Sequence, residues 1–433
     1  MQDRLSSILE LLKTNNIFLT GGAGTGKSFL TNQIVKEYIL EKKSVVTLGS
    51  TGISAINIAG QTIHSFFIFG ISSNFDELEV SDRYNRSRLK ELYKILSKLD
   101  LLVIDEISMV SASMMDMILY RLRSGGFKGR LLVVGDFFQL PPIIKQSSNS
   151  IFGDAIYAFE SSAWEHFGFI NVELIEVKRT SDREFMDILN SIRVGEVTSE
   201  VKKYLLALKD EPKELKEPSI LFGRNYEATK LNNQMLNSLP QKEVVLESIK
   251  SKKDKKLSDK RVQSWINSLP IEDNLVLKEG AKVLFTTNKW GTYHNGQRAI
   301  VEHIDEDSIV VSDLKTGKLI KVDRYEFELT KSVVNGDEVK SEVLYSLKQF
   351  PLRLCYAITI HKSQGMSIDE LVCNVEHIFA TSQFYVALSR SSNPKALKIE
   401  FNRPYFDRYL EQAIRVSENV KSFYKNEKFI EIK

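Results

Sequence analysis

Short, largely apolar runs alternate with amphipathic segments through the first third of the chain. The runs at residues 17–20, 45–48, 101–104 and 131–134 are typical of strands buried on both faces of a sheet. Segments with apolar residues at helical spacing lie between them, as at residues 29–40. Strands interleaved with helices in this way predict a parallel α/β domain.

The second half of the chain repeats this alternation with fewer turn signals. Residues 173–179 and 219–222 have the composition of strands. Apolar residues recur at helical spacing in residues 185–192 and 227–236. We therefore expect a second α/β domain after the first.

Three other segments depart from the alternation. Residues 75–98 are charged and weakly periodic, which predicts a small excursion from the first sheet or a solvated helix face. Residues 280–343 are strand-rich, with turn signals such as Asn295-Gly296, and predict a compact β module. Residues 250–261 are strongly basic, which predicts a solvated, charge-rich loop or, alternatively, a clamp on a DNA backbone.

Composition narrows the class of protein. The chain has 433 residues, enough for two or three domains, and 42% of them are hydrophobic. The net charge is only +3, so any nucleic-acid site must come from local patches. Two cysteines, Cys355 and Cys373, are too few for a disulfide framework. With no apolar run long enough to span a bilayer and no signal-peptide pattern, we expect an intracellular, cytoplasmic protein without a membrane partner.

A glycine-rich loop stands between the first strand and the helix that follows it. Its sequence from Gly21 to Ser28 is GGAGTGKS, in the strand–loop–helix context that a phosphate-binding P-loop requires. Glycines allow backbone N–H groups to turn toward phosphate oxygens, and the helix adds its positive N-terminal end. We expect Lys27 to reach the β- and γ-phosphates of a bound nucleotide and Ser28 to ligate Mg²⁺.

Carboxylates follow the third apolar run. Asp105 and Glu106 lie at the C-terminal end of residues 101–104, where open α/β sheets place their ligands. We expect Asp105 to hold the Mg²⁺ shell and Glu106 to deprotonate the attacking water. Gln139, which follows the next strand, is a candidate sensor of the γ-phosphate.

The remaining candidates have open alternatives. Residues 49–55 and 60–67 offer small residues and hydroxyls to a phosphate, but their spacing alone favours an ordinary strand-to-helix loop with Phe66 and Phe67 in the core. Gln2 is a candidate adenine reader or an exposed glutamine near the terminus. A second α/β domain that delivers an arginine across a cleft would stabilise charge on the transferred phosphoryl group. Taken alone, such an arginine is more often a surface ion-pair residue.

Seven motifs occur in one order along nearly the whole chain: GGAGTGKS, STGISAINIAGQTIHSFF, LLVIDEISMV, GDFFQLPP, ELIEVKRTSDREFMDILNSIRVG, YAITIHKSQGMSID and YVALSRS. This set resembles the Pif-type (petite integration frequency) DNA helicases of superfamily 1B, and is similar also to RecD and Dda helicases. One departure is Thr180, where the family usually has glutamine after the arginine at Arg179.

The resemblance implies an α/β fold with two RecA-like P-loop NTPase domains. It implies a first domain over residues 1–172, with a small wedge insertion at about 68–98. The second domain would span residues 173–433, with a Src-homology-three-like β-barrel insertion at about 296–350 and a basic loop at about 241–275. The chain would then be a bare, monomeric motor core, for which a bacterial or phage origin is plausible.

The resemblance also assigns roles to residues at matching positions. The implied catalytic residues are Lys27, Asp105, Glu106, Gln139, Arg179 and Arg390. The implied ATP-binding residues are Gln2, Gly21, Gly22, Ala23, Gly24, Thr25, Gly26, Lys27, Ser28, Gln364 and Gly365, with Ser28 and Asp105 on Mg²⁺. The implied DNA-binding residues are Thr51, Gly52, His64, Thr359, His361, Lys362 and Ser363.

The implied activity is ATP-driven movement on single-stranded DNA with 5′→3′ polarity. Such a motor would unwind duplex, tailed or structured DNA, including G-quadruplexes and RNA–DNA hybrids, and the family has roles in DNA repair, recombination and telomere maintenance. A DNA-dependent ATPase that acts as a clamp without unwinding shares every motif. A P-loop kinase for a small molecule would leave the second α/β half and the late arginine unexplained.

Overall fold

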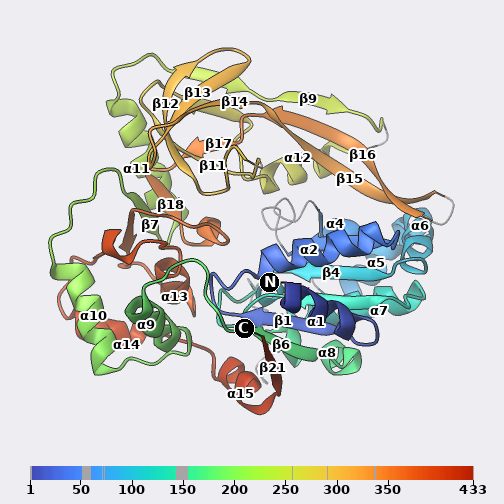
Figure 1. The fold of residues 1–433 in the computed structure, drawn as a ribbon. Coiled ribbons are helices and arrows are strands. Elements are labelled where there is room, and N and C mark those ends of the chain that lie inside the picture. Colours follow the sequence, from blue (N-terminus) through green and yellow to red (C-terminus); the bar gives the residue numbers. More distant parts are fainter. Residues whose placement is uncertain are drawn as a thin grey trace. The chain divides into compact units, whose positions relative to one another are not determined.

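The computed structural model describes residues 2–50, 60–70, 72, 74–142, 155–255, 257–289, 291–335 and 338–432. The chain divides into two compact units (Figure 1). The first unit comprises Met1–Lys178, Thr330–Val343 and Ser417–Lys433, and the second comprises Arg179–Leu329 and Leu344–Val416. Both contain a parallel sheet flanked by helices, which confirms the expected α/β fold with two RecA-like domains.

The first unit is built on a seven-stranded parallel sheet in the order β21-β6-β1-β5-β4-β2-β3. Its strands are β1 (Ile17–Gly21), β2 (Val45–Gly49), β3 (Gln61–Thr62), β4 (Leu101–Asp105), β5 (Arg130–Val134), β6 (Ile170–Leu174) and β21 (Phe429–Ile432). Every residue of β1 and β4 is buried, as their continuous apolar runs predict. Because the strands are parallel, the C-terminal ends of β1, β4 and β5 lie at one edge of the sheet.

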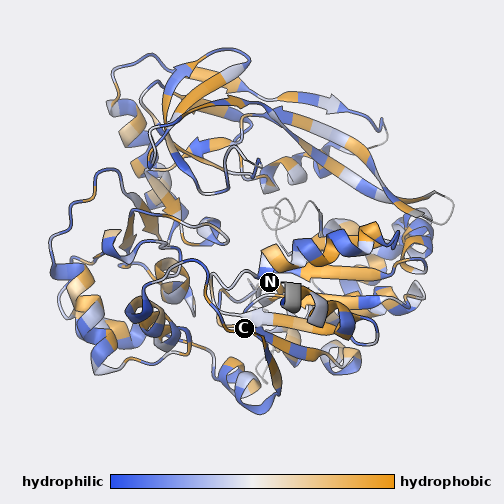
Figure 2. Cartoon of the chain, in the orientation of Figure 1, coloured by the Kyte–Doolittle hydropathy of each residue, from blue (hydrophilic) through white to orange (hydrophobic). Residues whose placement is uncertain are grey.

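Helices cover both faces of this sheet. They are α1 (Gln2–Leu12), α2 (Lys27–Leu40), α4 (Ile63–Phe66), α5 (Phe75–Tyr84), α6 (Arg86–Leu96), α7 (Ala112–Ser124), α8 (Ser162–Phe167) and α15 (Glu418–Asn426). Ile17 and Leu19 pack with residues of α1 and α2, whereas Phe18, between them, packs on Phe137 and Trp164. This alternation follows from the pleat of the strand. Figure 2 shows apolar residues concentrated in the strands and mixed faces on the helices.

Two helices, α5 and α6, lie within the expected wedge segment at residues 68–98. A buried ion pair holds α5 to the rest of the unit: Arg121 of α7 donates two hydrogen bonds to the Asp82 carboxylate, at 2.6 and 2.5 Å. The same guanidinium donates from Nε to the Phe67 carbonyl at 3.0 Å. Because Arg121 is fully buried, removing Asp82 would leave an uncompensated charge in the interior.

The second unit contains a four-stranded parallel sheet in the order β18-β7-β19-β20. Its strands are β7 (Ser219–Phe222), β18 (Ala357–Thr359), β19 (Leu371–Asn374) and β20 (Leu397–Glu400). The helices of this α/β part are α9 (Arg183–Arg193), α10 (Ser199–Asp210), α11 (Asn225–Ser238), α13 (Gln383–Leu388) and α14 (Phe406–Ala413). This second parallel sheet with its helices is the second α/β domain that the sequence predicted.

An antiparallel β module is inserted between β7 and β18. Its main sheet has the order β14-β13-β12-β11-β17, and smaller sheets pair β10 with β8 and join β15, β16 and β9. The strands are β8 (Val244–Glu247), β9 (Ile249–Lys252), β10 (Asn274–Leu277), β11 (Lys282–Phe285), β12 (Arg298–Ile304), β13 (Ser308–Asp313), β14 (Leu319–Asp323), β15 (Tyr325–Asn335), β16 (Glu338–Gln349) and β17 (Leu352–Leu354). The Src-homology-three-like barrel stays a prediction.

The expected basic loop at residues 241–275 is ordered secondary structure. It contains β8, β9, helix α12 (Asp259–Ser268) and the start of β10. Among its many charged residues the segment contains a few apolar ones, Leu246, Val262 and Ile266, and all three are buried. The prediction of a loop over residues 241–275 was therefore wrong, because a few well-spaced apolar side chains were enough to order the segment.

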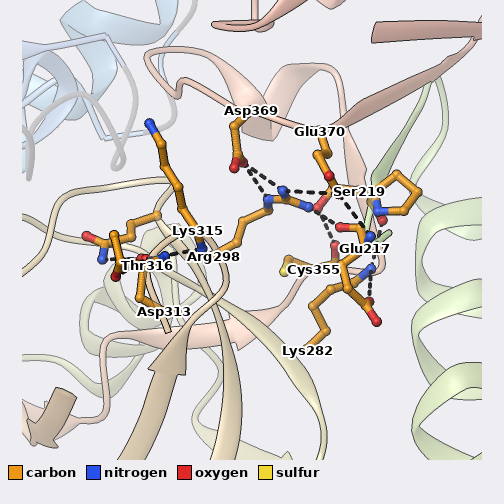
Figure 3. Close-up of polar contacts among 12 residues, drawn as sticks. Glu217, Ser219, Lys282, Arg298, Asp313, Lys315, Thr316, Cys355, Asp369 and Glu370 are labelled. Atoms are coloured by element: carbon orange, nitrogen blue, oxygen red, sulfur yellow. Dashed lines mark hydrogen bonds and ion pairs between the residues drawn. The ribbon is translucent and has the colours of Figure 1, made fainter. Parts of the chain in front are cut away.

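Two buried cations attach the β module to the parallel sheet of the same unit (Figure 3). Arg298 of β12 donates to the Asp369 carboxylate from Nε at 2.9 Å and from Nη2 at 2.7 Å, and it also donates to the Glu217 carbonyl. Lys282 of β11 donates to the Pro218 carbonyl at 2.7 Å. Both cations are therefore satisfied, which is the condition under which a buried charge is tolerated.

The last segment of the chain returns to the first unit. Strand β21 pairs in parallel with β6, and helix α15 packs its aromatic residues on the sheet. We expected residues 173–433 to form the second domain, whereas Ser417–Lys433 belongs to the first unit. The pairing joins segments more than 250 residues apart, which local patterns cannot reveal. None of the helices in the described ranges is long and apolar enough to cross a membrane.

Replacing Phe423 with alanine should destabilise the first unit. The ring lies 4.5 Å from that of Phe159 and 5.7 Å from that of Phe137. Truncating a fully buried phenylalanine costs about 3–5 kcal/mol, and we expect roughly half of that here because Phe423 is half-buried. The measurement is the urea midpoint, with the exposed Lys425→Ala on the same helix as the control. Equal midpoints for both variants would contradict the role of α15.

Candidate nucleotide site and DNA-facing residues

The glycine loop between β1 and α2 has the backbone that a phosphate cradle needs. Gly24 and Gly26 adopt positive φ angles of 81° and 89°, a region that favours glycine. At Gly21 a Cβ atom would lie 2.4 Å from the Leu174 carbonyl oxygen, so no larger residue fits there. Gly26 precedes α2 without a side-chain cap, which leaves the first N–H groups of the helix to a ligand.

The Lys27 side chain folds back onto the loop. Its Nζ donates to the carbonyls of Gly21 at 2.7 Å and Gly22 at 3.0 Å. The Thr25 hydroxyl also donates to the Gly22 carbonyl, at 3.0 Å, and this side chain is buried. Together these bonds hold the loop in a compact fold, with a cation that can turn toward phosphate oxygens.

The paired carboxylates lie at the end of β4. Asp105 is buried, and its Oδ1 accepts the Glu106 N–H at 2.9 Å. Burial raises the pKa of Asp105 to about 7, the Glu106 charge acts in the same direction, and Lys27 opposes them. Glu106 itself adopts a left-handed backbone with φ 54°, an uncommon conformation for a residue with a side chain.

A hydroxyl and a carboxylate are suitable magnesium ligands. Ser28, which is exposed, and Asp105 offer hard oxygen donors, and Mg²⁺ is usually held by one or two carboxylates plus substrate phosphates. Among the described residues no group of three or more His, Cys, Asp or Glu side chains could hold a metal without such help. The residues present therefore fit an ion that arrives with its nucleotide.

Gln139 follows β5 in a tight turn close to β4. Its N–H donates to the Asp136 carbonyl at 2.8 Å, and its side chain is buried. A Cβ at Gly135 would lie 2.9 Å from the Ile107 nitrogen, so the end of β5 approaches the segment after Glu106 closely. This approach brings the candidate sensor to the edge of the sheet that carries the carboxylates.

Tyr424 is a residue of this site that sequence reasoning missed. Its hydroxyl lies 2.7 Å from the Thr20 hydroxyl, just before the phosphate loop, and accepts the Phe137 N–H at 3.4 Å. Its ring packs on Phe138, next to Gln139. The tyrosine thus ties the strand that leads into the phosphate loop to the turn that carries the candidate sensor. No local signal could have found it, since the contact spans 404 residues.

In the second unit, two arginines share one partner residue. Arg179 donates from Nη1 to the Ser389 carbonyl at 2.5 Å, and Arg390 donates from Nη2 to the Ser389 hydroxyl at 2.9 Å. Arg390 is buried and also donates to the Val386 carbonyl at 3.0 Å. Removal from water and the nearby Arg390 charge lower the pKa of Arg179 to about 9, so Arg179 remains a cation at neutral pH.

Residues 359–365 form the turn that follows β18. The Thr359 hydroxyl accepts the Lys362 N–H at 3.4 Å, and the Ser363 hydroxyl donates to the Ile360 carbonyl at 2.8 Å. Both side chains are buried, so they shape the turn instead of presenting hydroxyls at its surface. Lys362 is exposed, and the half-buried His361 stacks on the Phe379 ring at 6.0 Å. Gln364 and Gly365, with φ 75° at the glycine, complete the turn.

The other expected positions are placed as follows. His64 lies in α4, half-buried against Phe69, and burial lowers its pKa, so it is neutral at pH 7. Gln2 is the first residue of α1, and its side chain lies outside the described part of the chain. Thr51 and Gly52 also lie outside the described residues.

One backbone hydrogen bond links the phosphate loop to the chain that leaves the first unit. The Lys178 N–H donates to the Gly24 carbonyl at 2.7 Å. Lys178 is the last residue of the first segment of that unit, and the next residue is Arg179. The loop is therefore one peptide unit away from one of the two arginines.

A phosphate loop and paired carboxylates on one parallel sheet, followed by a second α/β unit with two arginines, define a P-loop ATPase with two RecA-like domains. The family model described as PIF1-like helicase matches residues 4–203. Together with the relatives described next, this match shows that the chain belongs to the PIF1-like helicase family.

Two bacterial relatives match over nearly their full length. The ATP-dependent DNA helicase Pif1 of Campylobacter jejuni is 40% identical, with 100% of this chain and 98% of the relative covered. The enzyme of the same name from Bdellovibrio bacteriovorus is 35% identical, with 97% and 90% covered. A solved structure of Bacteroides sp Pif1 in complex with ADP-AlF4 is 30% identical, with a TM-score of 0.81, and covers 98% of this chain and 96% of its own.

Replacing Glu106 with glutamine should leave ATP binding intact and slow hydrolysis. The amide keeps the size of the side chain but cannot accept a proton from water, and loss of a general base typically costs about 10²–10⁴-fold. Single-turnover hydrolysis and nucleotide binding, measured side by side, separate the two steps. A hydrolysis rate within a factor of two of wild type would remove Glu106 from the mechanism.

Proposed function

We propose that this chain is an ATP-dependent DNA helicase that moves 5′→3′ on single-stranded DNA and unwinds the duplex ahead of it. The main observation behind the proposal is that the candidate ATPase residues are divided between the two units. The phosphate loop and the carboxylates lie in the first unit, and the two arginines lie in the second. The peptide bond between Lys178, which bonds to the phosphate loop, and Arg179 joins the two units. The names of the relatives, ATP-dependent DNA helicase Pif1, support the same function.

Different residues would have different roles in ATP hydrolysis. Backbone N–H groups of residues 21–28 and the Lys27 ammonium would bind the phosphates of ATP. Glu106 would take the proton of the attacking water, and Gln139 would orient that water or sense the γ-phosphate. Arg179 and Arg390 would stabilise the charge that develops on the transferred phosphoryl group when the two units close on ATP.

Ser28 and Asp105 are the residues that would hold Mg²⁺ with the nucleotide. The ion would neutralise charge on the β- and γ-phosphates. Asp105 accepts the Glu106 N–H, and a bound cation would oppose the effect of burial, which raises the pKa of this carboxyl.

DNA would be gripped through its backbone by both units. Lys362 and His361 on the surface of the second unit, and the region of His64 in the first, would contact phosphates or stack on bases without reading sequence. Helices α5 and α6 would act as the wedge that separates strands. A Bacteroides Pif1 has been solved bound to single-stranded DNA, which supports this partner. Tailed and structured DNA, including G-quadruplexes and RNA–DNA hybrids, are the proposed substrates.

We further propose that the motor acts as a monomer. The relatives from Campylobacter and Bdellovibrio favour a bacterial origin, and in a bacterium its DNA substrates would lie in the cytoplasm. Binding should weaken as salt rises, since contacts to phosphates release counterions.

The enzyme should unwind a duplex that carries a 5′ single-stranded tail and fail on one that carries only a 3′ tail. The physical basis is that one unit leads and the two grips alternate in a fixed order as the units close and open. The measurement is fluorescence unwinding at low salt with ATP and Mg²⁺, using substrates that differ only in the tail.

Glu106→Gln is the matched control, because it should bind both substrates and unwind neither. A preference for the 3′ tail, or equal rates on both tails, would contradict the polarity while leaving the ATPase assignment intact. Stimulated ATP hydrolysis without unwinding of either substrate would favour the clamp over the motor.

A further inference from the structure

The last helix of the chain reaches the end of β1, next to the phosphate loop. Helix α15 and strand β21 belong to the first unit, although the chain enters this segment from the second unit at Ser417. Within the segment, the Tyr424 ring and hydroxyl contact two different parts of the candidate ATPase site. The segment is therefore a neighbour of the site as well as an edge of the sheet.

The Tyr424 hydroxyl bridges the two elements that must be aligned for hydrolysis. Its oxygen lies 2.7 Å from the Thr20 hydroxyl, directly before Gly21 opens the phosphate loop. The same oxygen accepts the Phe137 N–H at 3.4 Å, two residues before Gln139. A phenolic hydroxyl can accept one hydrogen bond and donate another, so one atom serves both sides.

The turn that carries Gln139 is held together by its own hydrogen bonds. The Gln139 N–H donates to the Asp136 carbonyl at 2.8 Å, and the Asp136 carboxylate accepts the Phe138 N–H at 3.1 Å. The Tyr424 ring packs on the Phe138 ring, with 4.6 Å between the centroids. Because these contacts make the turn one body, a shift of Phe137 would carry Gln139 with it.

Burial restricts the geometry of this bridge. Thr20 is fully buried and Phe137 is 1% exposed, so water has little access to either partner of the tyrosine. A buried polar group that loses its partner costs free energy, which favours the bridged arrangement over one in which the turn has moved away. The main chain adds a second link, because the Gly135 N–H donates to the Leu19 carbonyl at 3.1 Å.

We propose that Tyr424 is a positioning residue for ATP hydrolysis, whose hydroxyl sets the place of Gln139 relative to the phosphate loop. The inference rests on the proposed ATPase function and extends the site to a helix near the end of the chain. Tyr424 acts through Gln139, whose side chain would meet the γ-phosphate or the attacking water. Its effect is therefore confined to the step in which the phosphoryl group is transferred.

A tyrosine that only anchors the C-terminal segment would behave differently. Removing its hydroxyl would lower the urea midpoint and leave the affinity of the folded enzyme for nucleotides unchanged. Removing a positioning hydroxyl would leave the affinity for ADP unchanged but weaken the binding of ADP with aluminium fluoride, which mimics the transferred phosphoryl group. Tyr424→Phe separates these cases, because it keeps the ring that packs on Phe138.

The test is equilibrium binding of fluorescent ADP with Mg²⁺, with and without aluminium fluoride, together with single-turnover ATP hydrolysis. Tyr424→Phe should bind ADP as wild type does. Its gain in affinity from aluminium fluoride and its hydrolysis rate should each fall about tenfold, because a small misplacement near the reacting group is costly. Thr20→Val should have a similar effect, and the double variant should lose little more than Tyr424→Phe alone, since both changes break the same bond.

Asn419→Ala is the matched control. Asn419 lies on the same helix and donates to the Glu160 carboxylate, so its loss removes an anchor of α15 without touching the tyrosine hydroxyl. It should keep the wild-type affinity with and without aluminium fluoride. Gln139→Ala is the positive control and should lose the same gain in affinity as Tyr424→Phe.

An unchanged gain in affinity in Tyr424→Phe would overturn the assignment while Gln139→Ala shows that the site itself is intact. A loss of equal size in Asn419→Ala would also overturn it, because the effect would then belong to the whole helix. If Gln139→Ala keeps the wild-type gain, the proposed role of Gln139 fails and the positioning role fails with it. All of these measurements are made without DNA, so a failure of the helicase function would leave their result standing.

Discussion

The site depends on one backbone hydrogen bond, from the Lys178 N–H to the Gly24 carbonyl. A bond of this kind contributes only about 1 kcal/mol net, so its importance is geometric. Gly24 belongs to the loop that must hold the phosphates, and Lys178 is followed directly by Arg179. Any change in the shape of the loop on binding or losing phosphate therefore reaches the first residue of the second unit through a single peptide.

The segment in which the chain returns to the first unit is bonded to strand β1. Ser417–Lys433 rejoins the first unit, and there Tyr424 bonds to Thr20 at the end of β1. One place where the chain passes between units is thus bonded to the phosphate loop, and another is bonded to the strand that leads into this loop. In the second unit, Ser389 serves both Arg179 and Arg390, so the two cations are oriented together. This arrangement suits a motor in which nucleotide state sets the relation of the units.

Sequence patterns were sufficient for the parts of the structure that are local. The P-loop, the buried strands and the carboxylates at the end of β4 follow from short-range rules, and the structure has them there. The prediction of a basic loop was wrong at residues 241–275, where a few apolar positions order strands and a helix. Tyr424 and β21 contact residues that are far away in the sequence, and the burial of Thr359 depends on tertiary packing. The spacing of apolar residues along the chain predicts neither of these features.

ATP hydrolysis with and without single-stranded DNA, measured on Lys178→Pro and Lys178→Ala, tests the central claim most directly. Proline removes the N–H that binds Gly24, whereas alanine keeps it and loses only the side chain. The account predicts that DNA stimulates hydrolysis by wild type and Lys178→Ala, and that Lys178→Pro still binds ATP and DNA but loses this stimulation. Stimulation of Lys178→Pro equal to that of wild type would contradict the account.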